Sequence, residues 1–565
     1  MPGIRRSALL ALALLVGGAA NDFGLEDAAG TSAFEPKGTF SDYLTGRFAE
    51  QQGDLDIAAD RLRAALAQDA GVGEVANQAF VAAVLAGRPD AARLATGVAD
   101  NAVAQLVLAD RDAKNENWEQ AEARFSALPQ QGLTQILRPL LIAWAQQGAR
   151  RTTAALAGLQ PALEEPRFRG VMALHAALIA DLGGFNGDAA RLYEVAQAAY
   201  GGLNLRLGQI VASWQARQGN EDEAKRTVDD MVSANGDLAL ARDALERDVG
   251  NRQVRNATDG IAETYLAMAA TLRQQNANDS AQVLLRLALD VREDFTAARL
   301  LLADIQEGNK QTGAAAQTLA GVPPTDPLAV VVTLRRANLL DGTGQEDEAT
   351  RMLEALAQNY PDRPEPLVQV GDSLRRRNRF HEAAAAYDRA VARIGTPSRA
   401  NWPLFYERGI AFERDNQWPK AEADFEYALQ LAPDQPNVLN YLGYAWVDRG
   451  HEVDRARHMI ERAVEQRPND GAFIDSLGWV QLRQGDTAGA LKNLERAVEL
   501  QSEDPVINAH LGDALDAVGR HREAEFQWRR ALNLNPEPDD QARIEGKLRD
   551  AAALPATRTA SPGTP

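Results

Sequence analysis

The sequence predicts an all-α fold of stacked helical hairpins, and three observations lead to that prediction. Within residues 470–536, Leu477-Gly478 is matched 34 residues later by Leu511-Gly512. Apolar residues recur at spacings of three and four along most of the chain, as they do on one face of an α-helix. We find no run that alternates apolar and polar residues in the manner of a half-buried strand. A fixed period of this length, with small and large apolar residues at set offsets, indicates a helical repeat array.

The first twenty residues differ from the rest of the chain. Arg5 and Arg6 precede an unbroken apolar run over residues 8–16, and small residues follow at 17–20. This order predicts a secretory signal peptide, because the run is too short for a membrane span of about 20 residues. An apolar N-terminus that stays uncleaved is the alternative. We expect residues 1–20 to be a signal peptide, residues 21–39 to be a linker, and the mature protein to be periplasmic without a transmembrane span.

Residues 40–232 carry a weak form of the repeat. We take a small residue in the first helix of each unit as a reference. An alanine follows twelve residues later, and a large apolar residue stands four beyond it, as in Ala143, Ala155 and Leu159. Phe80 is a poor reference, and Thr96 stands where a large residue is expected. We therefore predict a degenerate repeat array here, followed by an irregular joint at 233–260 that holds the charged stretch DLALARDALERDV.

Residues 261–536 carry the repeat strongly. The reference residues are Ala269, Ala303, Ala337, Gly371, Gly409, Gly443, Gly478 and Gly512. The alanines that follow are Ala281, Ala315, Ala349, Ala383, Ala421, Ala456, Ala490 and Ala524. The large residues are Leu285, Leu319, Leu353, Tyr387, Phe425, Ile460, Leu494 and Trp528. Small residues let two helices approach closely, and no unit can bury its apolar face alone, so neighbouring units must stack.

The chain after residue 536 predicts an end to the array. Residues 537–553 read as an amphipathic helix with Ile544 and Leu548 on one side, which suits a polar-backed cap. Residues 554–565 contain three prolines, and we expect them to be a disordered tail.

These residues resemble tetratricopeptide repeats, in which each unit is a pair of antiparallel helices. Pro361, Pro433, Pro468 and Pro536 follow second helices, where that family usually has proline. The resemblance implies helix-turn-helix units stacked into a right-handed superhelical solenoid of about 14 units. The combination with a signal peptide resembles exported repeat proteins of Gram-negative, alphaproteobacterial cells.

Composition and motifs argue against several classes of function. The net charge of −19 disfavours nucleic acid and anionic lipid as partners. The absence of cysteine excludes disulfides and thiolate metal sites. None of the six histidines has the spacing of a zinc helix, and neither a phosphate-binding loop nor a nucleophile elbow occurs. We therefore predict a protein that is not an enzyme and holds no cofactor or metal.

The resemblance implies that a partner binds in the concave groove lined by first helices. By helical spacing, residues six and three before each reference, and one and four after it, share that face. The predicted groove residues are Arg375, Tyr406, Asn440, Tyr444, Val447, Asp475 and Trp479. Exposed Tyr, Trp and Arg are typical of binding hot spots. The alternative is that Tyr444 and Trp479 only pack between neighbouring first helices.

Two functions remain open at this point. The first is a scaffold of the cell envelope that binds a protein or peptide whose identity the sequence does not reveal. The second is a component of an envelope assembly system, such as polysaccharide export, outer-membrane protein biogenesis or pilus biogenesis, with peripheral attachment to outer-membrane complexes.

Overall fold

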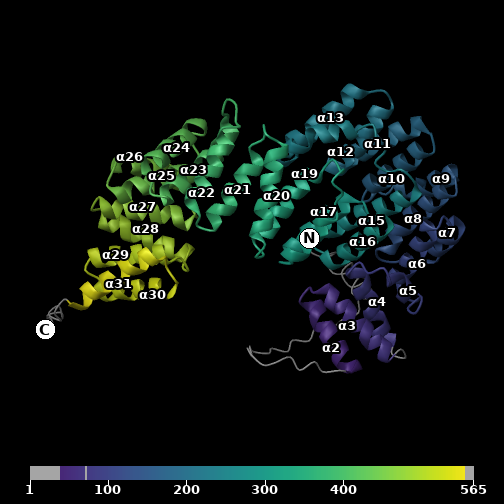
Figure 1. The fold of residues 1–565 in the computed structure, drawn as a ribbon, viewed down its shortest axis with the longest axis horizontal. Coiled ribbons are helices and arrows are strands. Elements are labelled where there is room, and N and C mark those ends of the chain that lie inside the picture. Colours follow the sequence, from purple (N-terminus) through teal and green to yellow (C-terminus); the bar gives the residue numbers. More distant parts are fainter. Residues whose placement is uncertain (1–37, 70–72, 554–565) are drawn as a thin grey trace. The chain divides into compact units, whose positions relative to one another are not determined.

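Every regular element in the described part of the chain is a helix, which confirms the all-α prediction (Figure 1). The computed structural model describes residues 38–69 and 73–553. The predicted signal peptide, nearly all of the predicted linker and the C-terminal tail lie outside these ranges. Within them, no helix is both long enough and apolar enough to cross a bilayer.

The chain divides into two compact units, one ending at Leu356 and one beginning at Ala357. The helices of the first unit are α2 (Thr39–Gln51), α3 (Leu55–Gln68), α4 (Gly73–Leu85), α5 (Ala91–Ala95), α6 (Ala102–Lys114), α7 (Trp118–Ala127), α8 (Thr134–Gly148), α9 (Thr152–Leu163), α10 (Arg169–Leu182), α11 (Asn186–Tyr200), α12 (Leu205–Arg217), α13 (Glu221–Ala234), η1 (Gly236–Ala241), α14 (Arg242–Asp248), α15 (Ala257–Gln274), α16 (Asn278–Val291), α17 (Thr296–Gly308), α18 (Thr312–Ala320) and α19 (Ala329–Asp341). The boundary falls within α20 (Glu346–Asn359).

The second unit is a regular succession of helical hairpins. Its helices are α21 (Glu365–Arg376), α22 (Phe380–Val391), η2 (Arg399–Asn401), α23 (Trp402–Arg414), α24 (Trp418–Leu431), α25 (Pro436–Arg449), α26 (Val453–Gln466), α27 (Gly471–Arg483), α28 (Thr487–Leu500), α29 (Pro505–Ala517), α30 (His521–Asn533) and α31 (Pro538–Ala553). Each odd-numbered helix from α21 to α29 is the first helix of a hairpin and carries a reference glycine. At the C-terminal end, Ile544 of α31 is buried in the same cluster as Trp528.

The two helices of a hairpin approach most closely at the reference residue. A Cβ atom added at Gly409 would lie 2.6 Å from Cε1 of Phe425, and one added at Gly478 would lie 2.6 Å from Cγ of Leu494. The large residue therefore packs on the reference glycine of its own unit, a contact that the sequence pattern does not assign. The same contact joins Gly46 to Leu62, Gly371 to Tyr387, Gly443 to Ile460 and Gly512 to Trp528.

The turn inside a hairpin repeatedly uses one residue with a left-handed backbone. Gly485 has a φ of 85° and Asn378 a φ of 57°. Glycine adopts this conformation without steric cost, and asparagine tolerates it better than most residues. Arg150 and Lys310 occupy equivalent turns with φ of 60° and 62°, where their Cβ atoms are strained. The turn geometry is therefore kept even where the preferred residue types are missing.

The first unit contains contacts that a simple linear stack does not provide. Helix α15 packs against α8 as well as its hairpin partner α16, and α16 also contacts α4 and α6. The Tyr265 hydroxyl donates to both carboxylate oxygens of Asp110, at 2.8 and 2.9 Å, across 155 positions of sequence. Repeat arrays normally join neighbouring units only. The first unit therefore closes upon itself around α15.

Polar groups are buried where α15 meets the earlier helices. Burial raises the pKa of Asp110 well above its usual value, and the hydrogen bond from Tyr265 opposes that rise. The indole Nε1 of Trp144 donates to His175 Nδ1 at 3.0 Å. Burial lowers the pKa of His175 to about 3, so this histidine is neutral at physiological pH. The interior of the first unit is thus fixed by specific polar pairs as well as by apolar packing.

Candidate functional site

The first helices of the second unit form its inner face. Successive first helices contact one another, as α21 does with α23, α25 with α27, and α27 with α29. In the described residues, no comparably extensive contact joins successive second helices. In a curved stack the helices nearer the axis of curvature lie closer together. The first helices therefore line the concave side, and we call their exposed surface the inner face.

A charged and aromatic group lies at the α21–α23 end of the inner face. Arg375 Nε is 3.1 Å from a carboxylate oxygen of Glu407. Burial raises the pKa of Glu407, and the charge of Arg375 opposes that rise. Burial, together with the charge of Glu407, raises the pKa of Tyr406 to about 12. The Tyr406 ring on α23 also meets the Tyr441 ring on α25 edge-on, with centroids 5.8 Å apart, so an aromatic neighbour on the next first helix holds Tyr406 in place.

A second group lies across α25, α27 and α29 and is centred on His510. The Nδ1 atom of His510 is 2.9 Å from Asp475 Oδ2. The Trp479 ring stacks on the His510 ring, with centroids 4.2 Å apart and planes 16° apart. Tyr444 is the third aromatic side chain, with its ring 6.2 Å from that of His510. Burial and the charge of Asp475 raise the pKa of Tyr444 well above its usual value. We call Tyr444, Asp475, Trp479 and His510 the His510 cluster.

The His510 cluster contains polar atoms without a protein partner. Trp479 is 7% exposed and His510 is 1% exposed. Among the described residues, neither Trp479 Nε1 nor His510 Nε2 has a hydrogen-bond partner, and Asn440 Oδ1 on α25 has none either. Buried polar atoms are nearly always hydrogen-bonded, since an unpaired one costs about 1–3 kcal/mol. The three atoms are therefore candidates for a hydrogen bond to a bound partner.

The structure distributes the predicted groove residues unevenly. Tyr444, Asp475 and Trp479 meet around His510, whereas Arg375 and Tyr406 both lie beside Glu407. Asn440 is half-buried on α25, and Val447 is fully buried in the core. Trp479 and Asp475 are also buried, so only part of each side chain can reach a partner.

Neither His510 nor Glu407 is among the groove residues predicted from the sequence, where the histidines were examined only as metal ligands. His510 stands two residues before Gly512, outside the four offsets used to select the groove. The separation of 35 residues between Asp475 and His510 is one period plus one, which places them on facing sides of consecutive first helices. In the described chain, no cluster of three histidine or carboxylate side chains is arranged to hold a metal ion.

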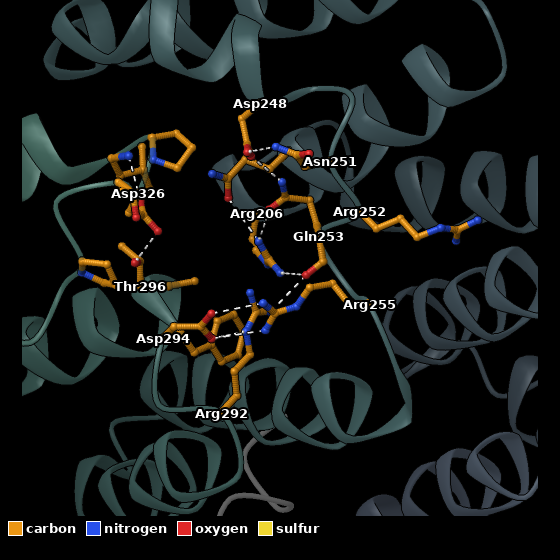
Figure 2. Close-up of a pocket in the computed structure, with 17 residues that line it drawn as sticks. Arg206, Asp248, Asn251, Arg252, Gln253, Arg255, Arg292, Asp294, Thr296 and Asp326 are labelled. Carbon is orange, nitrogen blue, oxygen red and sulfur yellow. Dashed lines mark hydrogen bonds and ion pairs between the residues drawn. The ribbon is translucent and has the colours of Figure 1, made fainter.

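The first unit contains a polar cavity of about 420 Å³ next to the segment 249–256 (Figure 2). Arg206, Arg252, Arg255 and Arg292 line it, and the Arg252 guanidinium points away from the cavity toward Asp181 (Figure 2). Figure 2 shows Asp248 bonded to Asn251 and Gln253 on one side, and Thr296 bonded to Asp326 on another.

The arginines of this cavity are held by carboxylates and an aromatic ring. Arg206 Nε donates to the buried Glu263 at 2.9 Å, and Arg255 bonds Asp259. Arg206 and Arg292 both lie over the Phe295 ring, with their guanidinium carbons 5.2 and 4.8 Å from its centre. Because nearby carboxylates match the four guanidinium charges, the lining has no excess charge that selects an anion. We interpret these pairs as the means by which the irregular segment is fixed to its neighbours.

Comparison with known proteins agrees with the repeat pattern of the second unit. The tetratricopeptide repeat family model matches residues 334–400, 406–471, 449–505 and 476–537. A TPR repeat-containing protein of Pseudomonas aeruginosa is 30% identical over 218 residues, or 38% of this chain and 36% of that protein. The putative cellulose synthase operon protein C of Escherichia coli O157:H7 is 25% identical over 207 residues, or 34% of this chain and 17% of that protein. The chain therefore carries tetratricopeptide repeats in its C-terminal half.

Comparison with solved structures gives matches with low TM-scores and low sequence identity. The Cut9 and Hcn1 hetero-tetramer of the APC/C gives a TM-score of 0.37 at 15% identity, covering 91% of this chain and 96% of that chain. Yeast Tom70 gives a TM-score of 0.35 at 12% identity, covering 91% of this chain and 95% of that chain. The matched region spans 36% of the Pseudomonas protein and 8–30% of each of four other curated relatives.

Proposed function

We propose that this chain is a non-enzymatic scaffold of the cell envelope that binds a protein or peptide on the inner face of its C-terminal repeats. Tetratricopeptide repeats form a scaffold suited to protein–protein interaction, and the model of that family matches residues 334–400 and 406–537. The proposal is that the His510 cluster is the centre of the binding surface.

The observation that carries this proposal is the pair of unpartnered polar atoms in a rigid aromatic group. Trp479 Nε1 can only donate a hydrogen bond. His510 Nδ1 faces the Asp475 carboxylate and therefore carries a proton, which leaves Nε2 free to accept from a ligand when the ring is neutral. A donor and an acceptor on stacked rings match the carbonyl and N–H groups of a peptide backbone.

The cluster is also well suited to bind with little loss of side-chain entropy. Asp475, Trp479 and His510 are buried, and the ring stack and the hydrogen bond to Asp475 hold these side chains in one arrangement. A preorganised surface loses less freedom on binding than a mobile one does. Tyr and Trp side chains in such settings commonly contribute most to an interface.

Photo-crosslinking in intact cells tests the proposed surface. A photoreactive phenylalanine analogue at Tyr444 should capture one or a few defined proteins. The matched control places the same analogue at Phe526, which is 64% exposed on the second helix α30. In protein that carries the analogue at position 444, the substitution Trp479→Phe keeps a stacked ring but removes the N–H donor. This substitution should reduce the amount of partner captured. Equal capture from both positions, or capture unaffected by Trp479→Phe, would rule out the inner face as the binding surface.

The proposed location rests on the N-terminal residues 1–20, which have the order of a secretory signal peptide. Cell fractionation combined with N-terminal sequencing tests it. We expect the purified protein to begin after residue 20 and to fractionate with the periplasm. Recovery of a chain that begins at Met1 from the cytoplasm would contradict this part of the proposal.

A second candidate function is a role as a component of an envelope assembly system. The similarity to a putative cellulose synthase operon protein C favours polysaccharide export among such systems. The same crosslinking experiment distinguishes the two functions. Capture of polysaccharide-export, outer-membrane or pilus assembly components supports the assembly role, whereas capture of periplasmic proteins or peptides supports the scaffold.

A further inference from the structure

The first described helix presents an apolar stripe on its outer side. Phe40, Leu44 and Phe48 are 76%, 50% and 63% exposed, and Ile57 on α3, the second helix of this hairpin, is 47% exposed. Residues four apart lie on the same side of a helix. The opposite side of α2 is buried against α3, with Gly46 in contact with Leu62. We call Phe40, Leu44, Phe48 and Ile57 the N-terminal apolar face.

The N-terminal apolar face is unlike the end of the array at the C-terminus. There, α31 buries Ile544 in the array and carries Asp539 and Asp540 in its first turn. Terminal units of repeat arrays normally need such a polar outer side to remain soluble. Four large apolar side chains exposed on the first hairpin, three of them in one stripe on α2, therefore point to a surface that is covered when the protein functions.

We propose that the N-terminal apolar face is a homodimer interface, in which a second copy of this chain covers it about a two-fold axis. This proposal is independent of the inner face of the C-terminal repeats. In an antiparallel pairing of two α2 helices, Leu44 lies at the axis, and Phe40 of each copy meets Phe48 of the other. A stripe of evenly spaced apolar residues is complementary to its own copy in this way, as a two-fold interface requires.

The exposed area fits a dimer of ordinary size. A fully exposed phenylalanine presents about 200 Å², so Phe40 and Phe48 at 76% and 63% exposure contribute roughly 280 Å². With Leu44 and Ile57 about half exposed, the apolar area is roughly 400 Å² per copy and roughly 800 Å² for two copies. Specific interfaces bury upwards of about 1,200 Å² in total, of which about 65% is apolar in homodimers. The face therefore supplies the apolar share of a small standard interface.

Charge argues against a lipid surface as the alternative occupant. Ile57 is flanked by the exposed carboxylates of Asp54 and Asp56. The basic residues of α2 and α3 are three arginines, each paired with a carboxylate: Arg47 with Glu50, Arg61 with Asp42 and Arg63 with Asp60. Helices that bind anionic membranes carry basic residues around their apolar side. An acidic border is tolerated at a protein interface, where a polar rim surrounds the apolar centre.

Sedimentation and cysteine crosslinking test the proposed dimer. The full-length protein should sediment at tens of micromolar as a species of twice the chain mass. Phe40→Ser combined with Phe48→Ser should weaken association at least about a hundredfold, because four phenylalanine rings leave each interface. Phe526→Ser removes an equally exposed phenylalanine from α30 and should leave the dimer unchanged. Circular dichroism checks that each variant keeps its helical content.

The chain contains no cysteine, so a single introduced thiol reports one position. Leu44→Cys should form a disulfide-linked dimer under copper phenanthroline oxidation, and Phe526→Cys should not. A wild-type protein that is monomeric at 100 µM, or equal crosslinking at the two positions, would overturn the proposal. Monomeric protein that floats with phosphatidylglycerol vesicles would also overturn it, in favour of a lipid surface.

Discussion

Replacing Gly409 with alanine tests the close helix approach that defines the repeat units. The added Cβ would lie 2.6 Å from Phe425 Cε1, whereas ordinary contacts begin near 3.4 Å, so the ring must move by 0.8 Å. Phe425 is fully buried and lies against the Tyr441 ring at 5.2 Å, which leaves little room for that movement. Overpacking of this kind costs about 1–3 kcal/mol, and the better helix propensity of alanine offsets about 1 kcal/mol. We expect a net loss of about 1 kcal/mol, the middle of a range of about 0–2 kcal/mol.

Urea unfolding followed by circular dichroism measures this loss as a decrease in the midpoint of roughly 0.5 M. Gly546→Ala is the matched control, because Gly546 lies within α31 and its nearest neighbour for an added Cβ is 3.9 Å away. That control should gain stability. Combining Gly409→Ala with Phe425→Leu should recover at least about 1 kcal/mol relative to additivity. The double variant recreates the pairing of Ala269 with Leu285. Additive effects, or a Gly409→Ala variant as stable as the control, would refute the packing argument.

Three further predictions concern the first unit and are measured by urea unfolding across pH. Arg150→Gly should stabilise the turn before α9 by about 0.5–1 kcal/mol, because Arg150 has a φ of 60°; a loss of stability would contradict the strain argument. The pKa of Asp110 is raised in the folded state, so the stability that Asp110 contributes decreases as pH rises above its unfolded pKa of about 4. The variant Asp110→Asn retains an acceptor for the Tyr265 hydroxyl and should remove that decrease. His175 has a folded pKa lowered to about 3, so the stability it contributes is complete above about 6.5 and is lost as pH falls, by about 1.4 kcal/mol per unit. His175→Asn keeps an acceptor for Trp144 and should flatten the curve between pH 6 and 4; an unchanged slope would exclude His175 as its source.

The repeat architecture of the second unit could be predicted because its determinants are local. Each reference glycine and its large partner, such as Gly478 and Leu494, recur at a fixed offset and meet within one hairpin. The closure of the first unit could not be predicted in this way. The Tyr265–Asp110 contact joins residues 155 positions apart and depends on the irregular backbone between α14 and α15. No periodic signal specifies such a contact.

The inner face was predictable only in part, because helical spacing selects a side of a helix and not the depth of a side chain. It identified Trp479 and Asp475, which do lie together. It could not foresee that His510 on the next first helix would stack on Trp479 and bury it. The sequence allowed Trp479 either to bind a partner or only to pack between first helices. In the structure it packs between first helices, and its indole N–H has no partner in the described chain.

The most direct test of the proposed function is the ¹⁵N resonance of the Trp479 indole in protein labelled at its eight tryptophans. The signal is assigned by its absence from Trp479→Phe. When the protein captured by crosslinking is added, we predict a downfield shift of this N–H as it acquires an acceptor. The resonance of Trp118, on α7 of the first unit, serves as the internal control and should not move. A tight complex in which the Trp479 signal stays unchanged would contradict binding at the His510 cluster.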